Sequence, residues 1–127
     1  MILLDTNILI ATTINDLEVL EKLARIARDG IAIGASTVAW AEFCNGPLSP
    51  EDRHRTETML DDNFADFTEA DARISAELFN LGGRRRGSNV DCMIAASAIN
   101  RRSPLLTRNL TDFSRFESQG LQLEPLN

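Results

Sequence analysis

The chain has 127 residues and a mass of 14.1 kDa, with 43% hydrophobic and 25% charged residues. These values predict a single domain over residues 1–127, exclude two domains of ordinary size, and require no disulfide or structural metal for a stable core. The net charge of −6 argues against indiscriminate binding to nucleic acid.

The sequence favours a soluble, cytoplasmic protein. Cys44 and Cys92 are far apart in the sequence and form no zinc or redox motif, which is typical of a reducing compartment. No apolar stretch approaches the roughly 20 residues that a membrane span needs, and the first five residues lack the features of a secretion signal. We therefore expect no membrane partner.

Short apolar runs between polar or turn residues predict four strands and a weaker fifth. Residues 1–4, and residues 104–107 up to the closing Thr107, are apolar without interruption, which is typical of strands covered on both faces. The other predicted strands are residues 31–34 and 121–124, and the weaker one is residues 64–68.

Helices are predicted between the strands from the spacing of apolar residues and from capping residues. The most specific start is Ser49-Pro50-Glu51-Asp52, which combines a cap, a proline at the first helical position and acids in the first turn. The last long helix is apolar on nearly every side and should be central. The helices are expected at residues 17–27 before Gly30, at residues 37–44 after Ser36, after Ser49, from Thr68 to Gly82, and at residues 92–99 after Ser88.

This alternation of strands and helices predicts an α/β fold, a three-layer sandwich in which helices flank a central parallel sheet of four to five strands. Such sheets bind ligands beyond the carboxyl ends of their strands. The polar residues that follow the predicted strands are therefore the first candidates for a functional site.

Four acids are expected at that edge, and each also has a purely structural interpretation. Asp5 follows the first strand and could cap the next turn. Glu42 lies in the helix after the second strand, partly among apolar neighbours, and could be a surface residue. Asp91 begins the apolar helix and could form a reciprocal cap with Ser88. Asp112 could satisfy its own loop after the fourth strand.

Taken together, the four acids predict a metal site. Two unpaired carboxylates about 4 Å apart repel each other by about 4 kcal/mol at an effective dielectric near 20, so a cation must sit among them or some must be protonated. Lys22 and His54 are not obvious counter-charges. An all-oxygen cluster selects Mg²⁺ or Mn²⁺, which could activate water for attack at phosphorus. Thr6, Thr107 and Asn109 are the expected supporting residues.

Charge is distributed unevenly along the chain. Residues 1–72 carry 5 basic and 14 acidic side chains, whereas residues 73–127 carry 8 basic and 5 acidic ones, and all 8 are arginines. The guanidinium group pairs with phosphate at two points, so a polyanion could dock on this side, although a solvated charged face fits the pattern as well. The candidates for docking a polyanion are Arg84, Arg85, Arg86, Arg101, Arg102, Arg108 and Arg115. Of these, the residues expected to bind RNA are Arg84, Arg85, Arg86 and Arg108.

Four segments carry a resemblance to a known family. They are MILLDTNIL at residues 1–9, STVAWAEF at residues 36–43, VDCMIAASA at residues 90–98 and TRNLTDF at residues 107–113. In this order the segments resemble PIN-domain ribonucleases, among them the VapC-like toxins of bacterial toxin–antitoxin pairs. The resemblance covers nearly the whole chain.

The resemblance implies a magnesium-dependent endoribonuclease that leaves a 5′-phosphate and a 3′-hydroxyl. It also implies a homodimer, silenced by a VapB-like antitoxin whose tail covers the site, and a structured RNA substrate such as tRNA or rRNA. Asp5 and Asp91 correspond to metal ligands, followed by Glu42. Asp112 matches the fourth acid, whose position varies in the family, and Asn109 is a supporting or alternative ligand.

Two alternatives to a toxin remain at the level of sequence. One is a stand-alone RNA-processing nuclease of the same fold that acts without an antitoxin. The other is a catalytically idle binding module, which the presence of all four acids disfavours. A neighbouring small open reading frame that encodes an antitoxin would distinguish the toxin from the stand-alone enzyme.

Overall fold

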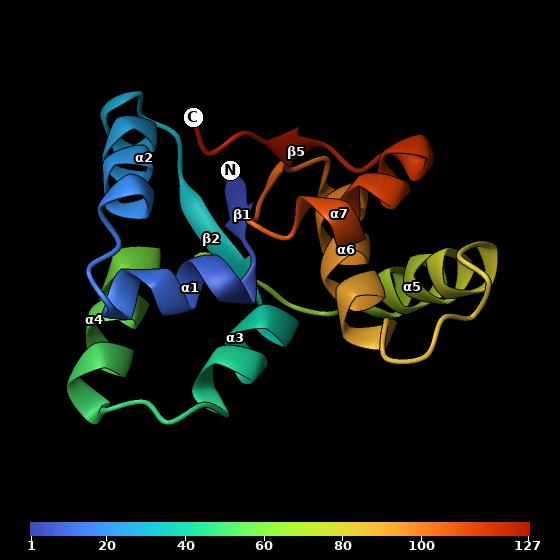
Figure 1. Ribbon diagram of the computed structural model, residues 1–127, viewed down its shortest axis with the longest axis horizontal. Helices are drawn as coiled ribbons and strands as arrows, with labels where there is room; N and C mark the ends of the chain where they lie inside the picture. The colour runs from blue at the N-terminus through green and yellow to red at the C-terminus, as the bar shows by residue number, and fades with distance from the viewer.

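The computed structural model describes residues 1–127 and contains a five-stranded sheet, all of whose strand pairs are parallel (Figure 1). The strand order is β3-β2-β1-β4-β5. The strands are β1 (Ile2–Leu4), β2 (Ile33–Ser36), β3 (Phe64–Ala65), β4 (Leu105–Leu106) and β5 (Leu123–Glu124). The predicted α/β fold with a central parallel sheet flanked by helices is confirmed.

Helices lie on both sides of the sheet, with α2 and α4 on one side in Figure 1 and α5 and α6 on the other. Helix α1 contacts α2, α3 and α4, and α5 packs along α6. None of the helices is both long and apolar enough to span a bilayer. The helices are α1 (Thr6–Thr13), α2 (Leu17–Arg28), α3 (Thr37–Cys44), α4 (Pro50–Leu60), α5 (Glu69–Leu81), α6 (Asn89–Arg101) and α7 (Leu110–Phe113), followed by the 3-10 helix η1 (Ser114–Gln119).

Three predicted caps form the helix starts for which they were proposed. The hydroxyls of Ser36, Ser49 and Thr68 each accept a hydrogen bond from the amide three residues later, at 3.1 to 3.2 Å. At Thr68 the cap is reciprocal, because its own amide donates to the Asp71 carboxylate at 3.0 Å. These bonds satisfy amides that have no partner inside a helix, so local sequence fixes where α3, α4 and α5 begin.

The structure departs from the expected elements at two places near the amino terminus. Strand β2 begins at Ile33, two residues later than predicted, because the amide of Ile31 still closes α2 by donating to the carbonyl of Ile26 at 3.2 Å. Helix α1 was not among the predicted elements. Its apolar residues occur in one continuous run, which carries no helical periodicity, and its start is fixed by the Asp5 cap.

The order of the strands places a ligand site between β1 and β4. The chain runs from β1 outward through β2 to β3, and then returns to β4 on the other side of β1. In doubly wound sheets, ligands bind at the carboxyl ends of the strands where the order reverses in this way. Leu4 pairs with Leu106, so the next residues, Asp5 and Thr107, emerge opposite each other at this point.

Close packing of β2 against the turn before β3 requires a glycine at position 34. A Cβ at Gly34 would lie 2.4 Å from the carbonyl oxygen of Asn63 and 2.8 Å from Met1 Sδ. Gly34→Ala is therefore expected to lower the free energy of unfolding by about 2–3 kcal/mol, measured by urea denaturation. Gly46→Ala is the control, since its Cβ would meet nothing closer than 3.5 Å. Equal unfolding free energies for the two variants would contradict this account.

Candidate functional site

Asp5 is the buried centre of a polar cluster at the carboxyl ends of β1 and β4. Only 5% of the residue is exposed. Its Oδ1 accepts a hydrogen bond from the amide of Thr6 at 2.8 Å, and its Oδ2 accepts one from Thr107 Oγ1 at 2.7 Å. Asp5 therefore caps α1 and also faces the end of the neighbouring strand, so its structural and functional interpretations are compatible.

Burial is the main reason that the charge of Asp5 is unfavourable in the absence of a cation. It raises the pKa of Asp5 to about 6, against an ordinary value of 3.8, even though the bonds from Thr107 and Thr6 oppose the rise. The charges of Asp91 and Glu42 raise this pKa further. The same edge of the sheet therefore holds three acids close enough to repel one another.

Glu42 reaches this cluster from α3 through a hydroxyl. Thr6 Oγ1 donates to Glu42 Oε1 at 2.5 Å, which links the second acid to the residue after Asp5. The expectation that Glu42 lies partly among apolar neighbours is wrong, because the residue is exposed. Its carboxylate nevertheless accepts the bond from Thr6, and its charge raises the pKa of both Asp5 and Asp91.

No group in the protein donates a hydrogen bond to the carboxylate of Asp91, although the sequence predicted a possible cap with Ser88. Ser88 Oγ donates backwards to the carbonyl of Arg85 at 2.7 Å and makes no cap with Asp91. Thr68 and Asp71, which have the same spacing at the start of α5, do form the reciprocal cap. Asp71 also accepts bonds from Asn100 and Arg101. The capping alternative thus fails for Asp91.

The pKa values of Asp71 and Asp91 are shifted in opposite directions, in agreement with their hydrogen bonding. Bonds from Thr68, Asn100 and Arg101 outweigh burial and hold the pKa of Asp71 below its usual value. For Asp91, burial raises the pKa, and the charges of Asp112 and Glu42 raise it further. A half-buried carboxylate without a donor and with acidic neighbours is suited to binding a cation.

Asp112 belongs to the same network through the loop after β4. The amide of Asn109 donates to the hydroxyl of Thr107 at 2.9 Å, and its side-chain nitrogen donates to Asp112 Oδ2, also at 2.9 Å. Asn7, from the start of α1, donates to Thr107 Oγ1 at 3.4 Å. The loop thereby fixes Asp112 relative to Asp5, and Asn7 is a member of this network that the sequence analysis did not single out.

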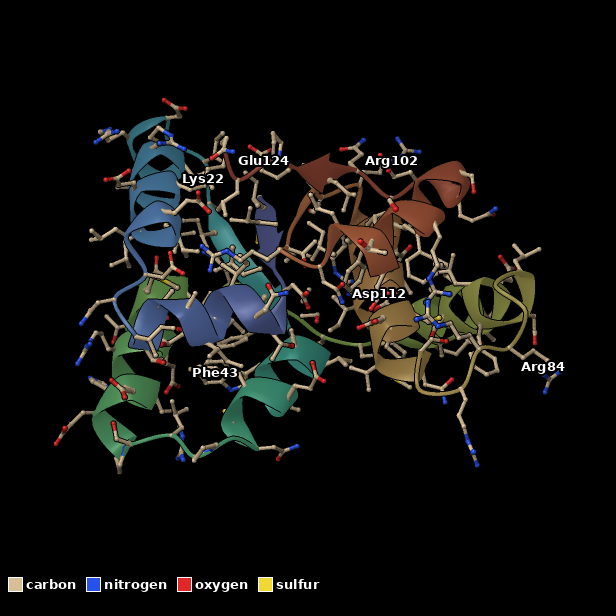
Figure 2. All side chains as sticks on the ribbon, viewed as in Figure 1. Lys22, Phe43, Arg84, Arg102, Asp112 and Glu124 are labelled. Atoms are coloured by element: carbon tan, nitrogen blue, oxygen red, sulfur yellow. The ribbon has the colours of Figure 1, made fainter.

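The four acids offer only oxygen ligands, and the nearby Arg85 and Arg115 lower the pKa of Asp91 without cancelling the rise caused by burial and by the acidic neighbours. Lys22 pairs with Glu124 at 2.8 Å (Figure 2), and His54 is exposed. As the side chains stand, no three His, Cys, Asp or Glu residues are grouped closely enough to hold a metal ion. The donor set nevertheless fits a hard divalent cation, because Asp5 and Asp91 both have raised pKa values that a nearby positive charge would lower.

The arginines proposed to bind RNA have very different surroundings. Arg108 is already paired with Asp16 and with Glu18, the latter at 3.2 Å. Arg85 Nη1 lies 3.6 Å from Asp112 Oδ1. Arg84 lies at the periphery, away from Asp112 (Figure 2). Of the four named residues, Arg85 and Arg86 line a pocket beside the acids, together with Arg115, which was not named for RNA binding.

Comparison with known proteins identifies the family. The family model for the PIN domain matches residues 2–118. The chain belongs to the PIN-domain family. The predicted membership is confirmed, and the match spans all four acids of the site. A search of curated protein sequences gives no match.

Solved structures of similar fold include several toxin–antitoxin complexes. A chain of VapBC2 from Rickettsia felis, bound to a promoter DNA fragment, is 27% identical with a TM-score of 0.72, and each chain is covered to 98%. A toxin–antitoxin complex from Klebsiella pneumoniae gives 26% identity, a TM-score of 0.71 and coverage of 90% of this PIN domain and 91% of the other chain. VapBC-1 from nontypeable Haemophilus influenzae gives 25% identity, a TM-score of 0.71 and coverage of 99% of this PIN domain and 98% of the other chain. These neighbours agree with the VapC-like resemblance.

Proposed function

We propose that this PIN domain is a metal-dependent endoribonuclease that acts as the toxin of a toxin–antitoxin pair. Family membership supports a nuclease, and the similarity to toxin–antitoxin complexes supports the toxin assignment. The single observation that carries the catalytic part is Asp91, a half-buried carboxylate with no hydrogen-bond donor, whose pKa is raised by burial and by the charges of Asp112 and Glu42.

Asp5, Glu42, Asp91 and Asp112 are the residues that would hold Mg²⁺, with Mn²⁺ as a substitute. Such an ion supplies an activated water and stabilises charge on the phosphate during in-line displacement. Asn109 donates to Asp112 from its side-chain nitrogen, so we assign Asp112 as the ligand and Asn109 as the residue that orients it.

The polar partners of the acids have positioning roles in this proposal. Thr107 is 2% exposed, and its hydroxyl holds one oxygen of Asp5 while it accepts the amide of Asn109. Thr6 holds Glu42 in the same way. These bonds fix the carboxylates before a cation or substrate arrives, which reduces the reorganisation that the reaction requires.

The proposed substrate is structured RNA, such as tRNA or rRNA, cut to leave a 5′-phosphate and a 3′-hydroxyl. The proposed partners are a VapB-like antitoxin that covers the site and a second copy of the chain, in the cytoplasm. The overall negative charge is compatible with an RNA substrate because Arg85, Arg86 and Arg115 lie together beside Asp91 and Asp112.

Expression of the chain with and without a candidate antitoxin tests this proposal directly. We expect growth arrest and new RNA 5′ ends when the chain is expressed alone, and neither when the antitoxin is present. New 5′ ends that persist unchanged with the antitoxin would indicate the stand-alone nuclease. No new 5′ ends in either condition, with soluble folded protein, would indicate a catalytically idle binding module and contradict the proposal.

A further inference from the structure

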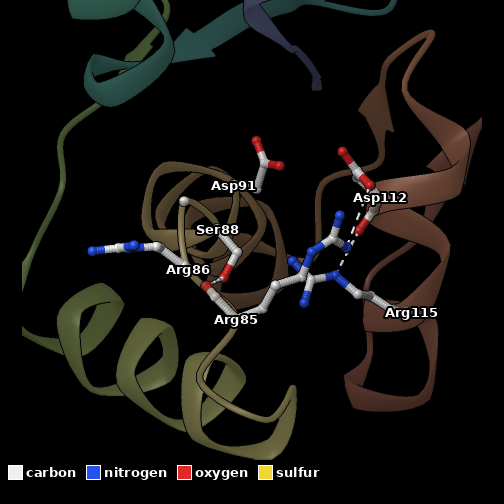
Figure 3. A pocket seen from close by; sticks show the side chains of 7 residues that line it. Arg85, Arg86, Ser88, Asp91, Asp112 and Arg115 are labelled. Carbon is white, nitrogen blue, oxygen red and sulfur yellow. Dashed lines mark hydrogen bonds and ion pairs between the residues drawn. The ribbon is translucent and has the colours of Figure 1, made fainter.

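A small pocket lies directly beside two of the four acids (Figure 3). Its volume is about 60 Å³, and no hydrophobic side chain lines it. A space of this size holds roughly four waters, and its wholly polar lining with three arginines suits an anionic group. The wall is formed mainly by Arg85, Arg86 and Arg115, with Ser88, Asp91 and Asp112.

Arg115 is held rigidly in this wall. Its Nε donates to the carbonyl of Asp112 at 2.8 Å, and its guanidinium carbon lies 4.3 Å from the centre of the Phe116 ring. Gly82 leaves room for the same group, since a Cβ there would lie 2.9 Å from Arg115 Nη1. The guanidinium is therefore preorganised by residues of α7 and η1 and by Gly82, which follows α5.

One donor of this preorganised guanidinium has no acceptor. Arg115 Nη2 is buried and makes no hydrogen bond in the protein. Buried donors are nearly always paired, because an unmade bond leaves the full cost of removing the group from water. The guanidinium therefore has one donor to spare for an acceptor brought by a ligand, which reaches Nη2 only when the side chain shifts enough to uncover it.

Arg85 lines the same pocket as Arg115 and has only a weak partner in the protein. Its side chain is 59% exposed, and its ion pair with Asp112 spans 3.6 Å, so water screens the attraction. The bond from Ser88 Oγ to the carbonyl of Arg85 holds the loop and leaves the start of α6 without a side-chain cap. Free amides at the start of a helix add to the attraction for an anion.

We propose that this arginine pocket binds a backbone phosphate of the RNA strand next to the scissile bond, an inference that rests on the proposed function. Arg115 and Arg85 both contact the phosphate oxygens. The guanidinium groups of this wall can pair with the phosphate oxygens in two-point geometry. The neighbouring Asp91 and Asp112 are then within reach of the adjoining part of the same strand.

Fluorescence anisotropy with a labelled single-stranded RNA oligonucleotide tests the pocket without catalysis. The full chain is titrated in EDTA over a range of KCl concentrations. We expect Arg85→Gln and Arg115→Gln each to weaken binding about tenfold, and to reduce the slope of log K against log salt by about 0.7. The matched control is Arg73→Gln, which removes the same charge from an exposed side chain paired with Glu69 on α5.

The outcomes of this titration test RNA binding by the pocket independently of nuclease activity. The pocket would be overturned if Arg73→Gln lost as much RNA affinity as the pocket variants, or if Arg85→Gln lost none. It would also be overturned if the parent chain bound no RNA. Because Arg115 packs on Phe116, its variant could unfold, and the exposed Arg85 then decides the result. A parent that binds through the pocket but cuts no RNA with Mg²⁺ would refute the nuclease alone. A parent that cuts, with variants that bind normally, would refute the pocket alone.

Discussion

Asp5→Asn is expected to abolish RNA cleavage and, at the same time, to make the metal-free protein more stable. The loss of activity should be at least about 100-fold, because a metal-ligating carboxylate contributes several kcal/mol to the transition state. The gain in stability follows from burial, which raises the pKa of Asp5 to about 6 from an ordinary value of 3.8. Ionised Asp5 therefore costs the folded state about 3 kcal/mol.

The pH dependence gives the sign of this effect. The folded protein binds a proton at Asp5 more tightly than the unfolded chain does, so this group lowers stability as the pH rises from about 4 to about 6. Asparagine carries no charge and removes the penalty. In EDTA, the variant should melt at a higher temperature than the parent at pH 7.5, and the difference should shrink towards pH 4.

Added Mg²⁺ should raise the melting temperature of the parent and have little effect on Asp5→Asn. Differential scanning fluorimetry measures both shifts, and gel analysis of a cleaved RNA measures activity. Cleavage at the parent rate by Asp5→Asn would show that this carboxylate is not a metal ligand. A variant that melts below the parent at pH 7.5 would show that the charge of Asp5 is already compensated.

Asp91→Asn and Asp71→Asn should have opposite consequences, although both residues are third in their helices. Asp91 has no hydrogen-bond partner, so Asp91→Asn should change the free energy of unfolding by less than about 1 kcal/mol and reduce cleavage at least about 100-fold. Asp71 is fully buried and accepts bonds from Arg101 and Asn100. Asp71→Asn should destabilise the fold by about 3 kcal/mol, because it leaves Arg101 without its charged partner.

Urea denaturation combined with RNA cleavage per folded molecule separates these two roles. Asp71→Asn should retain the cleavage rate of the parent at a temperature where it is folded. Strong destabilisation by Asp91→Asn with normal activity would reverse the assignment and make Asp91 a structural cap. The pair is informative because the substituted group, the helix position and the size of the change are the same.

Much of the fold was predictable because its signals are local. The caps at Ser36, Ser49 and Thr68 act within one helical turn, so sequence alone located the helices that follow them. Helix α1 escaped prediction because its apolar run has no helical periodicity and depends on packing against α2, α3 and α4. The exposure of Glu42 was also missed, since it depends on how α3 packs against α1, α6 and β2.

The amino-acid sequence by itself determined the class of fold, the family and the four acids, because strand and helix patterns and short motifs are encoded by neighbouring residues. Only the tertiary structure decided which acids are satisfied. Ser88-x-x-Asp91 and Thr68-x-x-Asp71 have the same spacing, but only the second forms a cap and receives Arg101 and Asn100 from another helix. The joining of Arg85 and Arg115 in one pocket likewise depends on the packing of distant segments, and such long-range contacts leave no pattern in the local sequence.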